Sequence, residues 1–409
     1  MAVSFLRYEV SDLCLAKPAL RSLSASATVA DALESLKTSQ DNFISVWDCN
    51  HSKPNSPDGG GVGGGGQLFC CIGKVCMVDV ICYLSKDDSL TSPSAALKAP
   101  VSEILTKIPG HVMHVEPSCS LLAAIDLILE GVQNLVVPIR TRSNSRRKQH
   151  PKPISAATTT IHNGQEFCWL TQEDVMRFLL SSIGLFSPLP AMSIDSLGII
   201  STDILAINYH SSASSALQLI SHSLSQQTSV AVVDTEGVLI GEISPFTLAC
   251  CDESVAAAIT TLSAGDLMSY IDCGGPPEHL VKTVMQRLKD RKLQGVLENY
   301  TLSSSSSYAH ALMMTSSSSD EESSVSPNRS LRRTRSERYT RSSSYSARMV
   351  RRAEAIVCHP KSSLVAVMIQ AIAHRVNYVW VIGDDCSLVG IVTFYGMLEV
   401  FREHLETMG

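Results

Sequence analysis

The apolar residues of this chain are spaced as in helices at four places along the sequence. At each place they recur at the i, i+3, i+4 and i+7 positions, which lie on one face of a helix packed against a core. Thr28, Ser120 and Ser363 precede three of these helices and can cap them, because their hydroxyls accept from free backbone N–H groups. The predicted buried faces are Val29, Leu33 and Leu36; Leu122, Ile125, Ile128 and Leu129; Ala213, Ala216, Leu217, Ile220 and Leu224; and Leu364, Val367, Met368 and Ala371.

Two short apolar runs of strand length follow each predicted helix, and the second run leads directly into another helix. The first runs share one pattern, in which Asn42, Asn134, Thr228 and Asn377 take the same place. A unit that recurs four times constrains the fold more than a single motif does, so the sequence predicts four copies of one β-α-β-β-α unit. The second runs are Gly73-Lys74-Val75-Cys76, Cys168-Trp169-Leu170-Thr171, Gly241-Glu242-Ile243-Ser244 and Gly390-Ile391-Val392-Thr393.

Three polar segments interrupt the repeats and are predicted to be loops or disordered: residues 49–67, 140–165 and about 303–352. Such segments bury too little apolar surface to offset the entropy lost on ordering. The glycine run at 59–66 fits G-x-G-x-x-G, but a strand follows it where a nucleotide-binding loop needs a helix, so we interpret it as a linker. The serine- and arginine-rich segment 303–352 is either a solvated insertion or a loop regulated by phosphorylation.

Composition narrows the class of protein. The 409 residues are 44% hydrophobic, enough for sizeable cores, and a net charge of −6 gives no overall basic field for nucleic acid. The 13 cysteines include no C-x-x-C and lie mostly in apolar runs, so we expect reduced, buried thiols and no metal site. The most apolar stretch, Phe178 to Met192, is too interrupted to span a bilayer. We therefore expect a protein of the cytoplasm, or of the nucleus.

The second strand and the helix after it follow the pattern G-h-h-[ST]-x-x-D, which resembles CBS domains. Asp79 and Asp174 fill the acidic position, while Thr247 and Gly396 replace it in the other two copies. The segments 374–381 (HRVNYVWV), 389–394 (VGIVTF) and 133–138 (QNLVVP) look like those of the plant four-repeat CBS proteins of the CBSX type. The short leads Ser11-Asp12-Leu13, Ser102-Glu103-Ile104-Leu105 and Ala264-Gly265-Asp266-Leu267-Met268 also resemble the segment that precedes each CBS repeat.

The resemblance implies an α+β fold of four CBS repeats paired into two Bateman modules. Its expected boundaries are 1–90, 91–185, 186–260 and 261–409, with the serine- and arginine-rich insertion inside the fourth repeat. In the family, an adenosine-containing ligand such as AMP, ADP, ATP or S-adenosylmethionine occupies the cleft between paired repeats. A carboxylate can accept from two ribose hydroxyls, and a hydroxyl at a helix start favours phosphate.

The ligand residues implied by the resemblance are spread over all four repeats. Repeat 2 is the most complete, because it has both the hydroxyl and the acid, whereas repeat 4 has a basic pair like that of the nucleotide-sensing subunit of the AMP-activated kinase. The candidates are Thr171 and Asp174 of repeat 2, Asp79 of repeat 1, Ser244 of repeat 3, and Thr393, His374 and Arg375 of repeat 4. Each has an ordinary alternative, because Thr171 and Asp174 can form a helix capping pair and Arg375 can be a solvated surface charge.

The sequence therefore indicates a non-enzymatic regulatory protein. It contains no nucleophile elbow, P-loop, H-E-x-x-H or kinase signature. The leading hypothesis is a sensor whose ligand changes its affinity for a partner, which the resemblance places in the thioredoxin system. The alternative is a ligand-free scaffold, for example a kinase-complex subunit regulated through the 303–352 segment. A homodimer stays open, and nucleic-acid binding through the basic loops is the weakest interpretation.

Overall fold

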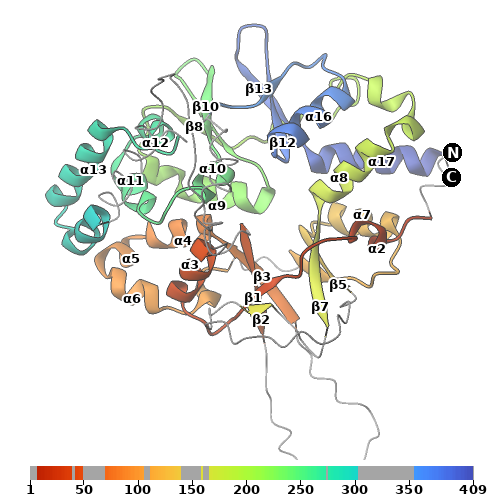
Figure 1. The fold of residues 1–409 in the computed structure, drawn as a ribbon. Helices are drawn as coiled ribbons and strands as arrows, with labels where there is room; N and C mark the ends of the chain where they lie inside the picture. Colours follow the sequence, from red (N-terminus) through yellow and green to blue (C-terminus); the bar gives the residue numbers. More distant parts are fainter. Residues whose placement is uncertain are drawn as a thin grey trace, which may run out of the picture.

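Four small sheets of the same topology form the framework of the protein (Figure 1). The computed structural model describes residues 7–38, 42–48, 70–105, 111–139, 158–159, 165–272, 275–302 and 354–408. In each sheet the first strand runs parallel to the second, and the second pairs antiparallel with the third. The strands are β1 (Arg21–Ser24), β2 (Phe43–Asp48) and β3 (Cys70–Cys76); β4 (Val112–His114), β5 (Asn134–Ile139) and β7 (Glu166–Thr171); β8 (Ala206–Asn208), β9 (Val230–Val233) and β10 (Leu239–Ile243); and β11 (Val357–Cys358), β12 (Tyr378–Ile382) and β13 (Leu388–Thr393).

Each sheet carries one helix between its first two strands and one after its third, which confirms the predicted β-α-β-β-α unit. We number these units repeats 1 to 4 and call repeats 1 and 2 module 1, and repeats 3 and 4 module 2. The connecting helices are α3 (Val29–Thr38), α7 (Leu121–Leu129), η4 (Ala213–Ala216) continuing into α9 (Leu217–Gln226), and α16 (Leu364–His374). The helices that follow the sheets are α4 (Met77–Leu84), α8 (Gln172–Ser181), α10 (Pro245–Ala249) and α17 (Phe394–Met408).

The predicted helix faces are largely confirmed. All four predicted residues of α16 are buried. In α7 the buried residues are Leu121, Ala124, Ile125 and Ile128, so the prediction was wrong for Leu122 and Leu129, which are partly exposed. The α9 face is likewise rotated, because Ile220 is buried whereas Leu217 and Leu224 are partly exposed. Both helices carry apolar residues next to the buried stripe, so spacing alone does not choose between neighbouring faces.

Two of the three predicted N-caps form as expected. The Ser120 hydroxyl accepts from the backbone N–H of Ala123 at 3.1 Å, and the Thr28 hydroxyl accepts from that of Asp31 at 3.2 Å. The Thr28 cap is reciprocal, since the Asp31 carboxylate accepts from the Thr28 backbone N–H at 2.9 Å. Ser363 occupies the N-cap position of α16, but its side chain makes no capping hydrogen bond.

The segment that leads into each repeat binds the other repeat of the same module. Helix α2 (Val10–Leu13) precedes repeat 1 but is tied to repeat 2, where the Val10 N–H donates to the Cys119 carbonyl at 2.9 Å. This exchange of lead segments between paired repeats forms four isolated β-bridges at the starts of the connecting helices. They are Glu9–Ser120, Thr28–Pro100, Ser193–Ser363 and Ser212–Ser263. The sequence prediction missed the third of these leads, residues 192–199. Because of this exchange, neither repeat of a module is complete without its partner.

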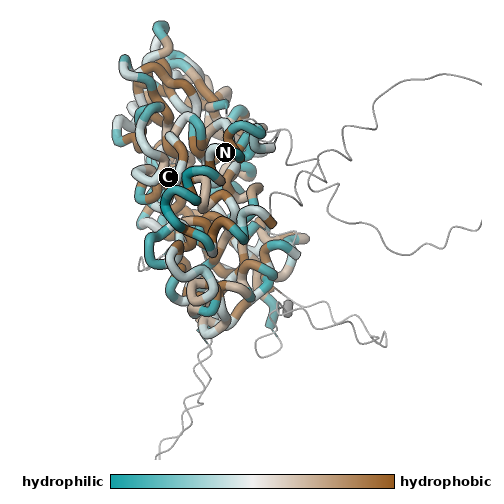
Figure 2. The backbone as a smooth tube through the Cα atoms, turned by 90° about the vertical axis from the view of Figure 1, so that its left-hand side faces the viewer, coloured by the Kyte–Doolittle hydropathy of each residue, from teal (hydrophilic) through white to brown (hydrophobic). Residues whose placement is uncertain are grey.

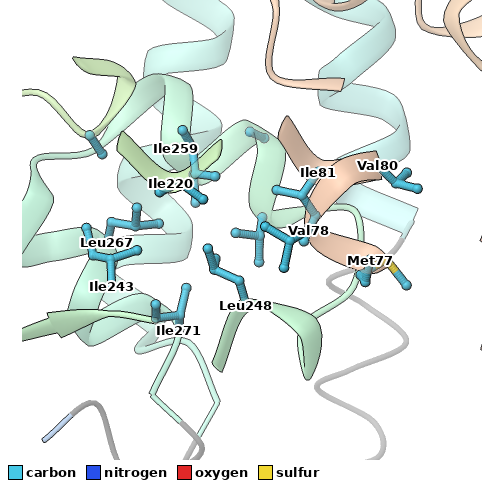
Figure 3. Packing of buried hydrophobic residues seen from close by; sticks show 14 of the residues in the cluster. Met77, Val78, Val80, Ile81, Ile220, Ile243, Leu248, Ile259, Leu267 and Ile271 are labelled. Carbon is cyan, nitrogen blue, oxygen red and sulfur yellow. The ribbon is translucent and has the colours of Figure 1, made fainter. Parts of the chain in front are cut away.

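Two large apolar cores join the modules to each other. One core unites repeats 1 and 3, and the other unites repeats 2 and 4. In Figure 3, Val78 and Ile81 of α4 point toward Leu248 of α10, and Ile220 of α9 belongs to the same cluster. On the other side, the Arg402 guanidinium of α17 forms an ion pair with Asp126 of α7. Figure 1 shows the repeats at four corners, and Figure 2, turned by 90°, shows a narrower profile with apolar segments gathered inside.

Part of the region between repeats 3 and 4 is helical, which the sequence prediction did not include. Helices α11 (Val255–Thr261), α12 (Ala264–Tyr270) and α13 (Glu278–Asp290) are followed by helical residues 294–302. Every residue of α11 is buried, and its C-terminal carbonyls at Thr261 and Thr260 accept from Arg287 of α13 and from Arg291, the residue that follows α13. The stripe of Leu280, Val281, Val284 and Leu288 has helical spacing and could have revealed α13.

The predicted loops lie mainly outside the described residues. Residues 49–67 and 303–352 are entirely outside them. The prediction for 140–165 was wrong at Thr158–Thr159, which form strand β6 and pair antiparallel with β1. The remaining elements are α5 (Asp87–Thr91), α6 (Pro93–Lys98), η1 (Val101–Glu103), η2 (Ile183–Phe186) and η3 (Leu189–Ala191).

Candidate ligand clefts between paired repeats

An aromatic cluster joins the two sheets of module 1. Trp47 of β2 is buried, and its ring lies 5.1 Å from that of Phe167 in β7 and 5.6 Å from that of His114 in β4. His114 also links the sheets through Nε2, which accepts from the Cys71 backbone N–H at 3.1 Å. The sequence analysis did not single out these residues, because an aromatic residue in a strand is usually core and gives no signal of an interface.

Asp79 of repeat 1 lies in the first turn of α4. Its carboxylate accepts from the Cys76 backbone N–H at 2.8 Å, which makes it part of the N-terminal cap of that helix. Burial raises the pKa of the Asp79 carboxyl from 3.8 to about 6, although the nearby Lys74 opposes the shift. A carboxylate offers about four acceptor positions, so this cap leaves room for further donors.

Lys74 of β3 reaches from repeat 1 to repeat 2. Its Nζ donates to Oδ1 of Asn134 in β5 at 3.2 Å and lies 4.5 Å from the centre of the Phe43 ring. Burial lowers the pKa of the Lys74 ammonium. Among the described residues, no carboxylate forms an ion pair with it. Neighbouring His111 also has a lowered pKa, first because it is partly buried and second because of the Lys74 charge.

The register of the strands shows why Asn134 faces this cleft. Phe43 pairs with Cys76, and Asn134 pairs with Thr171, so Asn134 is equivalent to Phe43. The sequence alignment, which matched Asn134 with Asn42, was therefore wrong by one residue. A shift of one residue along a strand moves a side chain to the opposite face. Lys74 could have been noticed in the sequence, because a charged residue stands there at an apolar position of the G-h-h-[ST] pattern.

Asp174 and Thr171 of repeat 2 form a reciprocal cap at the start of α8, which was the alternative to a ligand-binding role for them. The Asp174 carboxylate accepts from the Thr171 backbone N–H and from its hydroxyl, both at 2.8 Å. The same carboxylate oxygen also forms an ion pair with Lys17, which the sequence analysis did not anticipate. The Asp174 carboxylate, in the repeat that matched the family pattern best, is thus already bound by Thr171 and Lys17 of the chain itself.

The backbone around Lys17 holds its side chain over repeat 2. Ala16 adopts a left-handed conformation with φ 62°, which is unfavourable for a residue other than glycine. The Lys17 ammonium donates to the Trp169 carbonyl at 2.8 Å, and the Leu20 N–H donates to the Phe167 carbonyl at 2.8 Å. The lead segment therefore closes the Asp174 site with a basic side chain of the chain itself.

A buried polar network joins the two repeats of module 2. Glu242 of β10 is 1% exposed and accepts from the Trp380 indole N–H at 2.8 Å and from the Tyr378 hydroxyl at 2.9 Å. Ser244 is also buried, where its Oγ accepts from the Phe246 backbone N–H at 3.2 Å and lies 3.4 Å from the Tyr378 hydroxyl. Side chains of repeat 4 thus occupy the space next to the predicted hydroxyl of repeat 3.

The candidates of repeat 4 are not brought together. The Thr393 hydroxyl accepts from the Gly396 backbone N–H at 3.2 Å, as a helix cap. His374 and Arg375 are exposed at the C-terminal end of α16. Among the described residues, no hydrogen bond or ion pair joins either basic side chain to Thr393.

Comparison with known proteins decides the family. The chain is 53% identical over 415 residues to the CBS domain-containing protein CBSX5 of Arabidopsis thaliana, and the match covers 99% of both chains. The chain belongs to the CBS domain-containing proteins. The resemblance seen in the sequence is thereby confirmed. No family model matches the chain.

More distant CBS relatives match over most of the chain. CBSX6 of Arabidopsis thaliana is 27% identical and covers 96% of this chain and 93% of its own length. The SNF1-related protein kinase regulatory subunit gamma-like PV42b of Arabidopsis thaliana is 22% identical, and the match covers 98% of this chain and 96% of its own length. An archaeal homologue of g-AMPK from Methanocaldococcus jannaschii shares the fold, with a TM-score of 0.51, 12% identity and coverage of 96% of this chain and 100% of its own.

The Asp79→Asn variant of this CBS protein should be more stable than the wild type at neutral pH. Because the pKa rises from 3.8 to about 6 on folding, the native state holds a proton that the unfolded chain releases, and the wild type loses stability as the pH rises through that window. At about 1.4 kcal/mol per pKa unit, the difference reaches at most about 3 kcal/mol at pH 7. Urea unfolding between pH 4 and pH 7 checks this, and parallel pH profiles for both proteins would contradict it.

Replacement of Glu242 by alanine should destabilise module 2. Tyr378 and Trp380 would lose their shared acceptor inside the protein, at a cost of about 3 kcal/mol. Urea unfolding followed by circular dichroism measures the loss, with the exposed Glu236→Ala as the matched control. Equal unfolding midpoints for Glu242→Ala and Glu236→Ala would show that the network does not hold the two repeats together.

Proposed function

We propose that the chain is a non-catalytic regulatory protein whose first module binds an adenosine-containing ligand in the cleft at Asp79. The observation that carries this proposal is the contrast between the two modules. In module 1 the half-buried carboxylate of Asp79 is hydrogen-bonded, among the described residues, to Cys76 of its own helix cap, and it interacts electrostatically with the ammonium of Lys74. In module 2 the buried carboxylate of Glu242 is instead held by donors of the opposite repeat, Tyr378 and Trp380.

Asp79 is a better candidate than Asp174 for binding a ribose. Asp174 accepts two bonds from Thr171 and one from Lys17, so ribose hydroxyls would have to displace an ion pair. Asp79 is bound, among the described residues, by the backbone and side chain of Cys76 in its own helix cap, and its burial is an unfavourable contribution that new donors would relieve. This choice reverses the ranking that the sequence pattern suggested.

Ligand binding at Asp79 has a route to a partner protein. The Asp79 cleft lies between repeats 1 and 2, and helix α4 packs against repeat 3 through Val78 and Ile81 (Figure 3). A ligand that favours one relative placement of these repeats shifts the population toward it, and a partner that prefers that placement then binds more tightly. The proposed partners remain a thioredoxin-system protein or a kinase complex.

A ligand-free scaffold of a kinase complex is the second candidate function. Two relatives named as SNF1-related protein kinase regulatory subunit gamma-like proteins favour it, one of them aligned over 98% of the chain. Co-purification of an SNF1-related kinase that survives extensive removal of nucleotide would support the scaffold. Co-purification that depends on added nucleotide would support the sensor.

Calorimetric titration of the full chain with AMP, ADP, ATP and S-adenosylmethionine tests the proposal. We expect at least one of these to bind the wild type, Asp79→Asn to lose about 10-fold or more in affinity, and Asp174→Asn to stay within about 3-fold of the wild type. Since Asp79→Asn should be the more stable protein, its loss of binding would not come from unfolding.

Two results would contradict the proposal. Loss of binding in Asp174→Asn with retention in Asp79→Asn would move the site to repeat 2. If none of the four compounds binds or raises the melting temperature, the ligand-free scaffold is the function that stands. A bound ligand would be detected, because at about 100 times its Kd it adds about 2.7 kcal/mol of stability.

A further inference from the structure

Two cysteine side chains meet where the lead segment of repeat 1 contacts repeat 2. Cys14 is the C-cap residue of helix α2, and Cys168 lies in β7, where it pairs with Val137 of β5. Both thiols are free, and they are hydrogen-bonded to each other. Because the two residues belong to different repeats, a covalent bond between their sulfurs would fasten the lead of repeat 1 to repeat 2.

Hydrogen bonds around Cys14 hold its side chain against the strand of Cys168. The Lys17 N–H donates to the Cys14 carbonyl at 3.2 Å, and the Lys17 ammonium donates at 2.8 Å to the carbonyl of Trp169, the residue after Cys168. A disulfide has an S–S bond of about 2.0 Å and forms only between cysteines that are already close and suitably oriented. Thiols that are hydrogen-bonded to each other in a fixed backbone need only a small movement to meet this requirement.

The surroundings of Cys14 favour its thiolate form. The hydrogen bond with Cys168 lowers the pKa of the Cys14 thiol, and the charge of Lys17 lowers it further, although burial and the charge of Asp174 oppose the shift. The same hydrogen bond, together with burial, raises the pKa of the Cys168 thiol. Since the thiolate is the nucleophile in cysteine oxidation, Cys14 is the sulfur that attacks an oxidant.

The two sulfurs also differ in their access to solvent. Cys14 is 8% exposed and is followed by Leu15, which is 78% exposed, whereas Cys168 is 0% exposed. A small oxidant therefore meets Cys14 first, with Cys168 directly behind it. This arrangement of one attacking cysteine and one neighbouring resolving cysteine is typical of thiols that form reversible disulfides.

We propose that Cys14 and Cys168 are a redox modification site, at which hydrogen peroxide converts the two thiols into a disulfide. The Cys14 thiolate attacks one peroxide oxygen, the O–O bond breaks, hydroxide leaves and Cys14 becomes a sulfenic acid. The Cys168 sulfur then attacks the Cys14 sulfur, so that the S–S bond forms and the S–O bond breaks. The sulfenic hydroxyl leaves with the Cys168 proton as water. Two electrons thus pass from the thiols to the peroxide, and a dithiol reductant reverses the change.

The disulfide would make one of the exchanged lead segments a covalent part of the other repeat. In the reduced chain, hydrogen bonds and the ion pair between Lys17 and Asp174 hold this lead on repeat 2. In the oxidised chain the bond at Cys14, three residues before Lys17, would prevent the lead from separating. This inference goes beyond the proposed function and does not depend on an adenosine-containing ligand.

Mass spectrometry of the full chain tests the proposal directly. The reduced protein is treated with hydrogen peroxide, its remaining thiols are alkylated, and the monomer from a non-reducing gel is digested with trypsin. The tryptic peptides 8–21 and 149–177 contain Cys14 and Cys168 as their only cysteines. We expect these two peptides to be linked in the wild type and to separate on treatment with dithiothreitol.

Three variants assign the roles of the two cysteines. Cys14→Ala should give no linked peptides, and Cys168→Ala should leave Cys14 as a sulfenic acid that dimedone traps. Cys119→Ala, which removes a partly buried cysteine next to α2, is the matched control and should keep the linkage. The oxidised wild type should also melt about 5 °C or more above its reduced form, because the disulfide closes a long loop, and Cys14→Ala should lack this rise.

Two results would overturn the proposal. One is oxidation of the exposed Cys386 while peptides 8–21 and 149–177 stay unlinked, because the oxidant would then have acted and left the pair unchanged. The other is linkage of Cys14 or Cys168 to other cysteines in the same yield as to each other. Both results are read from the wild-type chain, so the test holds even if Cys168→Ala does not fold.

Discussion

The structure depends on the exchange of lead segments between paired repeats. Each lead closes the start of the connecting helix in the other repeat, through one β-bridge and adjacent backbone hydrogen bonds. A β-α-β-β-α unit of this size buries little apolar surface alone, so the unit that folds is the pair. The exchange also decides which side chains meet, because the segment after the lead of repeat 1 brings Lys17 to Asp174 and the segment after the lead of repeat 3 brings Ser201 against Ile391.

A single strand position explains much of the difference among the four repeats. The residue two places before the helix-start position of the third strand is Lys74, Trp169, Glu242 or Ile391, and each pairs with the equivalent residue of the middle strand. The lysine of repeat 1 donates to Asn134 of repeat 2, and the glutamate of repeat 3 accepts from Trp380 of repeat 4. One fold thus carries a lysine–asparagine contact between the repeats of module 1 and a buried carboxylate network between those of module 2, because the backbone tolerates different side chains at this position.

The sequence was sufficient for the fold but not for the site. Repetition revealed the β-α-β-β-α unit, and the spacing of Leu364, Val367, Met368 and Ala371 defined the buried face of α16 correctly. The cleft residues were harder, because a register error of one residue hid Asn134, and the Asp174 ion pair joins residues 157 apart in sequence. Contacts between distant segments depend on packing, which local spacing does not encode. Lys74, a charged residue at an apolar strand position, could nevertheless have been recognised from the sequence as an exception to the repeat pattern.

Hydrogen–deuterium exchange of the full chain, with and without saturating AMP, tests most directly the claim that module 1 is the ligand-binding half and module 2 a structural one. The account predicts slower exchange in peptides covering residues 70–79 and 111–136, with residues 228–247 and 376–396 unchanged. Protection confined to the module 2 peptides, or spread equally over both modules, would contradict it.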